Sequence, residues 1–98
     1  MLTKQYSKDK KNCKVTFTLP AQVHAANVAL EGDFTGWENA PVKMRHSSDG
    51  NFKASVSLEP GHRYRFRYRL DGERWENDWD ADSYQNNPYG TQDSIISI

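Results

Sequence analysis

The side chains of this chain that could do chemistry are large aromatic rings and arginines. Trp37 lies in a glycine-punctuated turn, Trp75 follows the hairpin signal Asp71-Gly72, and Trp79 and Tyr89 lie in a long polar segment. Turns and loops offer little to bury such rings. Since proteins rarely expose several large rings together without a ligand for them, the pattern predicts a surface on which flat molecules stack.

Sugar rings suit a surface of this kind. One face of a sugar ring presents C–H groups that lie against an aromatic ring, and the hydroxyls at its rim need hydrogen-bonding side chains. Trp37 and Trp75 could supply the platforms, and Arg67 could donate a fork of hydrogen bonds. Asp93 or Gln92 could bind hydroxyls at the edge. An alternative stays open, in which the tryptophans cap the core and the rings of the long segment pack against it.

The segments that must position these residues alternate apolar and polar side chains with a period of two, which predicts half-buried strands. Turn signals such as Asp49-Gly50 and Pro60-Gly61 separate them. No window shows the apolar stripe of a helix. The sequence therefore predicts an all-β, antiparallel sandwich of about 6–8 strands. The expected strands lie near residues 15–19, 28–30, 42–45, 52–58, 64–70, 74–76 and 94–98.

Two segments lack this alternation. Residues 1–12 are polar and rich in lysine, and we expect them to form a flexible arm in front of a domain over residues 13–98. Residues 77–90 are polar and aromatic, and we expect a long loop there. Loops of this length in a small domain are more often functional than idle, so the loop is a candidate part of a binding site.

Composition limits the classes of function. Lysine plus arginine equals aspartate plus glutamate at 13 each, so bulk positive charge does not hold the chain to nucleic acid or to an anionic membrane. Cys13 is the single cysteine, which excludes an intramolecular disulfide and favours a cytoplasmic location. We find no signal-peptide core in residues 1–12 and no stretch of transmembrane length.

Three motifs follow one another in the expected domain. They are Val28-Ala29-Leu30-Glu31-Gly32-Asp33-Phe34-Thr35-Gly36-Trp37, then Phe66-Arg67-Tyr68-Arg69-Leu70-Asp71-Gly72 with Trp75 and Asp78, then Asn87-Pro88-Tyr89-Gly90 with Asp93-Ser94-Ile95-Ile96-Ser97-Ile98. Together they resemble the signatures of carbohydrate-binding module family 48. That family includes the glycogen-binding domain of the AMP-activated protein kinase β subunit and the early-set domain of isoamylases and branching enzymes. The whole chain is also similar to stand-alone bacterial early-set proteins.

The resemblance implies an immunoglobulin-like, early-set sandwich that binds α-1,4-glucan such as glycogen or starch without catalysis or a cofactor. Thr35 replaces a frequent asparagine, which we expect to alter the turn before the tryptophan but not its ring. Asp93 replaces an asparagine and, while ionised, accepts but does not donate hydrogen bonds. Carried over residue by residue, the carbohydrate-binding positions are Trp37, Arg67 in place of lysine, Trp75, Tyr89 in place of an aliphatic residue, Thr91 and Asp93.

Catalytic and metal-binding functions find little support. The histidines are scattered, and no serine or cysteine lies in a nucleophile motif. Asp78, Asp80 and Asp82 have the spacing that opens an EF-hand calcium loop, but Ser83 and Tyr89 stand where that loop needs glycine and glutamate. A solvated acidic loop is the better interpretation.

Two other binding functions stay open. A protein–protein adaptor could use the same sandwich to dock onto a glucan-metabolising enzyme or a kinase-like complex. A single-stranded nucleic-acid binder could use the arginine stripe at Arg63, Arg65, Arg67 and Arg69 beside exposed rings. Salt separates glucan from nucleic-acid binding, because only phosphate-driven affinity falls steeply as salt rises.

Overall fold

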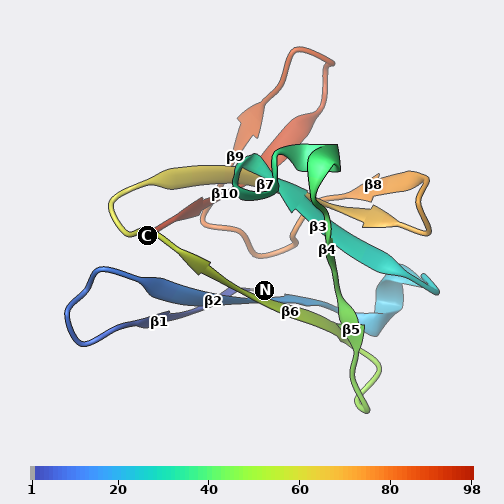
Figure 1. The fold of residues 1–98 in the computed structure, drawn as a ribbon. Coiled ribbons are helices and arrows are strands. Elements are labelled where there is room, and N and C mark those ends of the chain that lie inside the picture. Colours follow the sequence, from blue (N-terminus) through green and yellow to red (C-terminus); the bar gives the residue numbers. More distant parts are fainter. Residues whose placement is uncertain (1) are drawn as a thin grey trace.

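Two antiparallel β-sheets face each other in the computed structural model of the protein, which describes residues 2–98 (Figure 1). The first sheet has the strand order β1-β2-β6-β5, and the second has the order β4-β3-β7-β10-β9, with β8 paired to β7. The predicted all-β sandwich is confirmed. The strands are β1 (Leu2–Tyr6), β2 (Cys13–Leu19), β3 (Val28–Gly32), β4 (Val42–Lys43), β5 (Arg45–His46), β6 (Phe52–Leu58), β7 (Arg63–Leu70), β8 (Arg74–Glu76), β9 (Ser83–Asn86) and β10 (Gln92–Ser97).

Three short 3₁₀ segments join these strands: η1 (Ala21–Val23), η2 (Asp33–Thr35) and η3 (Trp37–Asn39). Across residues 2–98 the strands number ten, more than the expected 6–8, because the strand expected near 42–45 is divided into β4 and β5, and the polar strands β1 and β9 carry little apolar alternation. None of the helical segments in this part of the chain has the length and apolar character to cross a membrane.

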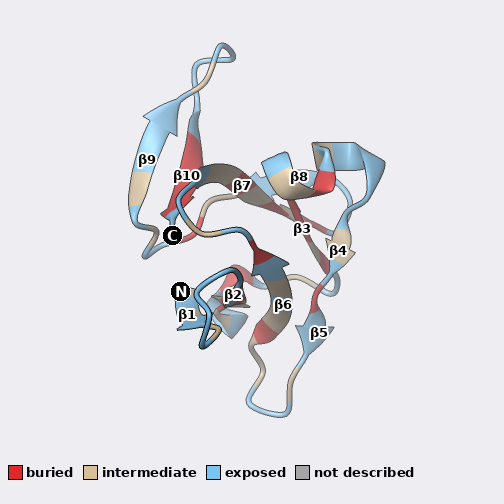
Figure 2. Ribbon diagram, turned by 60° about the vertical axis from the view of Figure 1, so that its left-hand side comes forward, coloured by how far each residue is buried: buried red, intermediate tan, exposed pale blue. Residues whose placement is uncertain are grey.

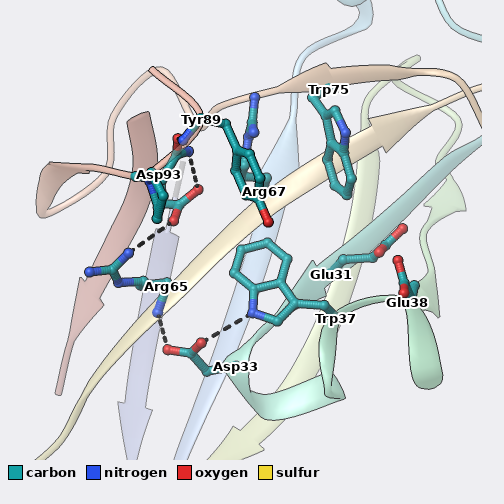
Figure 3. Close-up of a pocket in the computed structure, with 11 residues that line it drawn as sticks. Glu31, Asp33, Trp37, Glu38, Arg65, Arg67, Trp75, Tyr89 and Asp93 are labelled. Carbon is teal, nitrogen blue, oxygen red and sulfur yellow. Dashed lines mark hydrogen bonds and ion pairs between the residues drawn. The ribbon is translucent and has the colours of Figure 1, made fainter. Parts of the chain in front are cut away.

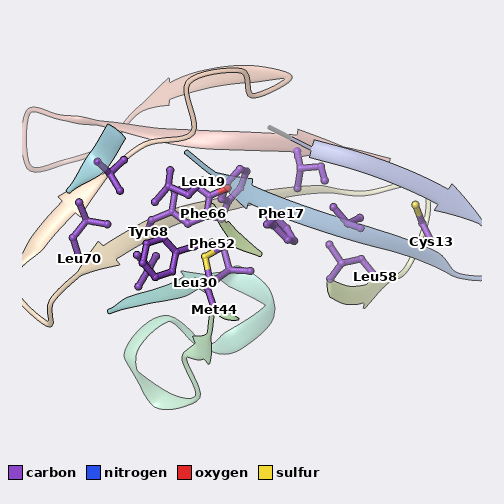
Figure 4. Packing of buried hydrophobic residues seen from close by; sticks show 14 residues of the cluster. Cys13, Phe17, Leu19, Leu30, Met44, Phe52, Leu58, Phe66, Tyr68 and Leu70 are labelled. Carbon is purple, nitrogen blue, oxygen red and sulfur yellow. The ribbon is translucent and has the colours of Figure 1, made fainter. Parts of the chain in front are cut away.

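The core lies between the sheets and follows from the period-two alternation (Figures 2 and 4). Alternate residues of β2 and of β7 are buried, and the rings of Phe17 and Phe66 meet edge to face across the sandwich with centroids 5.1 Å apart. The intervening residues of β7, Arg65, Arg67 and Arg69, are on the outer face of the second sheet. This face therefore carries the arginine stripe.

Strand pairing brings further side chains onto the same outer face. Glu31 of β3 lies opposite Arg67 of β7, and Trp75 of β8 lies opposite Arg69. Gly32 is required where β3 and β7 approach, because a Cβ there would come within 2.5 Å of the Arg65 carbonyl oxygen. β10 pairs with the start of β7 and β8 pairs with its end, so the two strands succeed each other along one edge of β7.

The N-terminal segment differs from the expected flexible arm. Leu2–Tyr6 form β1, which pairs with β2 in register from Leu2–Phe17 to Tyr6–Cys13. Lys4 also forms a 2.7 Å ion pair with Asp82 and donates a hydrogen bond to the Ser97 carbonyl. The strand is polar because it is an edge strand, and lysines are common on such edges. Met1 lies outside the described residues.

Residues 77–90 also differ from the expected long loop. Ser83–Asn86 form β9, which pairs with β10 as a hairpin. The remaining loop is anchored by Asp78, whose side chain accepts a 2.6 Å hydrogen bond from the Tyr68 hydroxyl inside the sandwich. Burial, together with the Asp78 carboxylate, raises the pKa of Tyr68 well above its usual range, so its hydroxyl stays a donor. Among the described residues, no cluster of histidine, cysteine or acidic side chains is placed to hold a metal ion.

Candidate binding site

A pocket of about 550 Å³ opens on the outer face of the second sheet (Figure 3). Its walls come from β3, the η2–η3 turn, β7, β8 and the β9–β10 hairpin. It gathers five of the six predicted site residues, and only Thr91 is not part of its lining. The lining consists of Glu31, Asp33, Trp37, Glu38, Arg65, Arg67, Trp75, Asn87, Pro88, Tyr89 and Asp93.

Trp37 is presented by a tightly constrained turn. Gly36 and Trp37 both adopt left-handed backbone conformations, with φ of 65° and 57°, which is a strained choice for a tryptophan. The Thr35 hydroxyl accepts a hydrogen bond from the Gly32 N–H at 3.1 Å and donates one to the Trp37 carbonyl at 2.9 Å. Thr35 thus closes the turn, and the turn projects the indole over the pocket (Figure 3).

The Trp37 indole is tied to the sheet by Asp33. Its Nε1–H donates to Asp33 Oδ1 at 3.2 Å, while Asp33 Oδ2 accepts from the Arg65 backbone N–H at 2.9 Å. The indole is half-buried and does not belong to the hydrophobic core. Trp37 is therefore an ordered part of the pocket wall.

Trp75 forms the second aromatic wall. It lies on β8, and 38% of its surface is exposed. The guanidinium Cζ atoms of Arg67 and Arg69 lie 5.1 and 4.2 Å from the indole centroid. Cations at such distances are attracted to the π-face of the ring. The arginine stripe thus contacts the indole directly.

The two tryptophans meet as a corner. Their ring centroids are 6.5 Å apart and their planes are inclined by 75°. Both belong to one pocket, but they are not a flat double platform. A ligand that contacts both rings has to turn between them.

Arg67 is the cation at the centre of this arrangement. Arg65 is paired with Asp93 at 3.4 Å, and Arg69 with Glu31 at 3.1 Å, whereas Arg67 has no carboxylate at ion-pair distance among the described residues. Its Nε is buried and makes no hydrogen bond within residues 2–98. Figure 3 shows Arg67, Tyr89 and the two tryptophans around one hollow. Arg67 thus lines the pocket without a carboxylate partner, and a hydrogen bond to a ligand has to come from its terminal Nη groups, because its Nε is buried.

The tip of the β9–β10 hairpin closes the pocket. Tyr89 is 89% exposed, and its ring projects from the tip next to Pro88. Asn87 organises this tip, because its Oδ1 accepts from the backbone N–H groups of Tyr89 and Thr91 and its Nδ2 donates to the Thr91 hydroxyl. The hydrogen bonds of Thr91 are thus made to Asn87 within the hairpin.

Asp93 is almost fully enclosed in the pocket wall. Only 6% of its surface is exposed, and its oxygens are held by Arg65 at 3.4 Å and by Asn87 Nδ2 at 3.2 Å. The carboxylate lines the pocket but already has partners. Through Arg65 and Asn87, the Asp93 carboxylate links β7 to the tip of the hairpin that carries Tyr89.

Several lining residues were not anticipated from the sequence. Glu31 shares its outward parity with Arg67, so strand alternation was a signal that could have found it, whereas Arg65 was named only in the arginine stripe of the nucleic-acid alternative. Asn87 precedes the Pro88 turn, where such side chains commonly bond the backbone two residues on. For Asp33 and Glu38 the sequence offered no clear signal, because both depend on the path of the η2–η3 turn.

A β-sandwich that holds an open, aromatic pocket on the outer face of one sheet belongs to the class of β-sandwich binding modules. The family model for the glycogen recognition site of AMP-activated protein kinase matches residues 13–98, nearly the whole chain, and the chain belongs to this family. The resemblance seen in the three sequence motifs is thereby confirmed. No curated protein matches the chain in sequence.

Proposed function

We propose that this protein is a non-catalytic module that binds α-1,4-linked glucan chains of the glycogen or starch type. The observation that carries the proposal is the aromatic corner of Trp37 and Trp75 beside Arg67 in a single pocket. Membership of a glycogen-recognition family supports the same ligand class.

Each part of the pocket has a role in this binding. Glucose rings stack on the faces of Trp37 and Trp75, and Tyr89 packs against one side of the chain. Arg67 donates hydrogen bonds to hydroxyls, and Asp93 accepts one at the edge. Thr91 supports the site through the hairpin. Because α-linked chains bend from one glucose to the next, they can follow the 75° turn between the rings.

The expected affinity is modest. Stacking on an aromatic ring contributes on the order of 1–3 kcal/mol per platform in nucleobase complexes, and hydrogen bonds that compete with water add little. If sugars stack similarly, the net free energy of binding favours the complex by about 4–7 kcal/mol. This corresponds to a Kd between about millimolar and tens of micromolar. A polymer with many sites compensates for weak single contacts. The module therefore acts by targeting a partner to glucan, or by sensing it.

We place this activity in the cytoplasm. Cys13 is a buried free thiol, and small domains of oxidising compartments usually rely on disulfides.

The test is retention on glycogen and on insoluble starch, comparing the wild type with Trp37→Ala, Trp75→Ala and Trp79→Ala. Trp79 is the matched control, because it is 54% exposed yet lies outside the pocket lining. We expect retention of the wild type and of Trp79→Ala at both low and high salt, and loss of retention for the other two variants. Absence of wild-type retention contradicts the proposed function and favours the adaptor alternative. Loss of retention at high salt favours a charged ligand.

A further inference from the structure

Trp75 has little backbone support of its own. It lies in the middle of β8, which has 3 residues and pairs with β7. An indole that is 38% exposed on so short a strand can adopt several rotamers unless neighbouring side chains hold it. The orientation of the Trp75 ring therefore has to come from side-chain contacts.

Arg69 is the side chain closest to that role. It lies opposite Trp75 in the β7–β8 register, and its Cζ is 4.2 Å from the indole centroid. Its Nη1 also donates a long hydrogen bond of 3.5 Å to the Gly72 carbonyl in the hairpin turn. Arg69 is not part of the pocket lining, whereas Trp75 is. Arg69 thus contacts the platform without forming the surface that a ligand meets.

Glu31 forms an ion pair with Arg69. Its Oε2 lies 3.1 Å from Arg69 Nε, without the geometry of a hydrogen bond, and only 3% of its side chain is exposed. Its second oxygen, Oε1, is buried and has no hydrogen-bond partner within residues 2–98. A buried carboxylate with an incomplete set of partners is a poor source of stability, since an apolar residue of similar size is often neutral or better. Stability alone does not explain this residue.

We propose that Glu31 and Arg69 are positioning residues for ligand binding: the Glu31 carboxylate orients the Arg69 guanidinium, and the guanidinium orients the Trp75 indole. This inference rests on the proposed function, because it concerns how the same pocket is kept ready for a glucan. A preset ring loses less side-chain freedom on binding, which raises affinity without a new contact.

The test combines glucan affinity with a spectroscopic reading of the ring pair. The variants are Arg69→Met, which keeps the chain length, Arg69→Lys, which keeps the charge without the planar group, and Glu31→Gln, which keeps the shape. Arg63→Met is the control, because Arg63 is on the same strand and exposed but lies outside the pocket lining. Maltoheptaose is the ligand for calorimetric titration. The far-ultraviolet exciton signal of the Trp37–Trp75 pair reports their mutual orientation.

We expect Arg69→Met to weaken binding by about five- to tenfold, because without the cation–π contact only a fraction of the molecules hold the Trp75 ring in the binding orientation. Arg69→Lys and Glu31→Gln should weaken it by about two- to fourfold, with a reduced exciton signal and cooperative unfolding in each variant. Arg63→Met should match the wild type. Should Arg69→Met fail to fold, Arg69→Lys gives the same comparison.

The outcomes separate the inference from the proposed function. If wild type and Trp75→Ala bind maltoheptaose equally, or neither binds, the proposed function fails. If Trp75→Ala loses binding while the Arg69 and Glu31 variants keep the wild-type exciton signal, the positioning inference is overturned and the proposed function stands. This holds whatever their affinity, because Glu31 also lines the pocket and could contact the sugar directly.

Discussion

Trp37 and Trp75 come from distant segments of the chain, yet their indoles meet at 6.5 Å with planes inclined by 75°. Strand pairing produces this meeting: β3 leads into the turn that carries Trp37, and β7 holds both β3 and β8. The ligand-facing geometry thus depends on the central strand of the second sheet.

The pairing predicts that the two rings act together. Trp37→Ala and Trp75→Ala should each lower affinity for maltoheptaose by about tenfold, as expected for one stacking platform. The double variant should lose less than the product of the two, because each ring also orders its neighbour. A calorimetric double-mutant cycle checks this coupling. Strict additivity would show that the rings bind independently.

A second prediction concerns the hairpin tip. Asn87→Ala removes the side chain that bonds Tyr89, Thr91 and Asp93, so it should weaken glucan binding several-fold. Thr91→Val should have a smaller effect, since the Thr91 hydroxyl bonds Asn87 and does not line the pocket. Titration of both variants with maltoheptaose distinguishes the two roles. A larger loss for Thr91→Val would assign a direct ligand contact to that hydroxyl.

The sequence predicted the parts of the fold that alternate strictly. Phe66 and Tyr68 are buried while Arg67 and Arg69 face outward, as a period of two requires. The sequence analysis did not predict β1, because this edge strand contains Lys4 and Gln5 and lacks the apolar alternation that indicates a strand. β9 was not predicted for a similar reason, since its residues are polar and mostly exposed.

For the site, the sequence identified five of the residues that line the pocket. It did not predict their hydrogen-bond and ion-pair partners or the angle between the rings. Rings in turns, such as Trp37, were recognisable because the strands leave them unburied. The partners of Asp93, the Glu31–Arg69 pair and the ring angle depend on cross-strand register. Register arises from tertiary pairing, and alternation along one strand does not define it.

A third prediction concerns the buried Tyr68–Asp78 contact. Tyr68→Phe removes the 2.6 Å hydrogen bond to the Asp78 carboxylate in the interior, and we expect it to lower the free energy of unfolding by about 1–3 kcal/mol. Tyr84→Phe is the matched control, because the 41% exposed Tyr84 donates to the Asp78 backbone carbonyl. Urea unfolding should show the smaller loss for Tyr84→Phe. Equal losses would mean that burial of the carboxylate is unimportant.

A fourth prediction concerns pH. The backbone N–H groups of Asn27 and Ala26 hold the pKa of Asp71 below its ordinary value. Because the pKa is lower in the folded state, the contribution of Asp71 is complete above the unfolded pKa of about 3.9 and is lost as pH falls through the folded value. Asp71→Asn, which suits the left-handed backbone there, should be less stable than the wild type at neutral pH.

That difference should shrink in acid. Thermal unfolding of the wild type and Asp71→Asn, measured at neutral pH and at about pH 2.5, checks the trend. A difference that stays constant across this range would show that the Asp71 charge does not stabilise the β7–β8 turn.

The most direct measurement is an NMR titration of the ¹⁵N-labelled protein with maltoheptaose, following the indole N–H signals of the three tryptophans. The signals of Trp37 and Trp75 should shift together and saturate, while that of Trp79 stays in place. Indole signals of Trp37 and Trp75 that do not move at saturating sugar would contradict glucan binding at the aromatic corner.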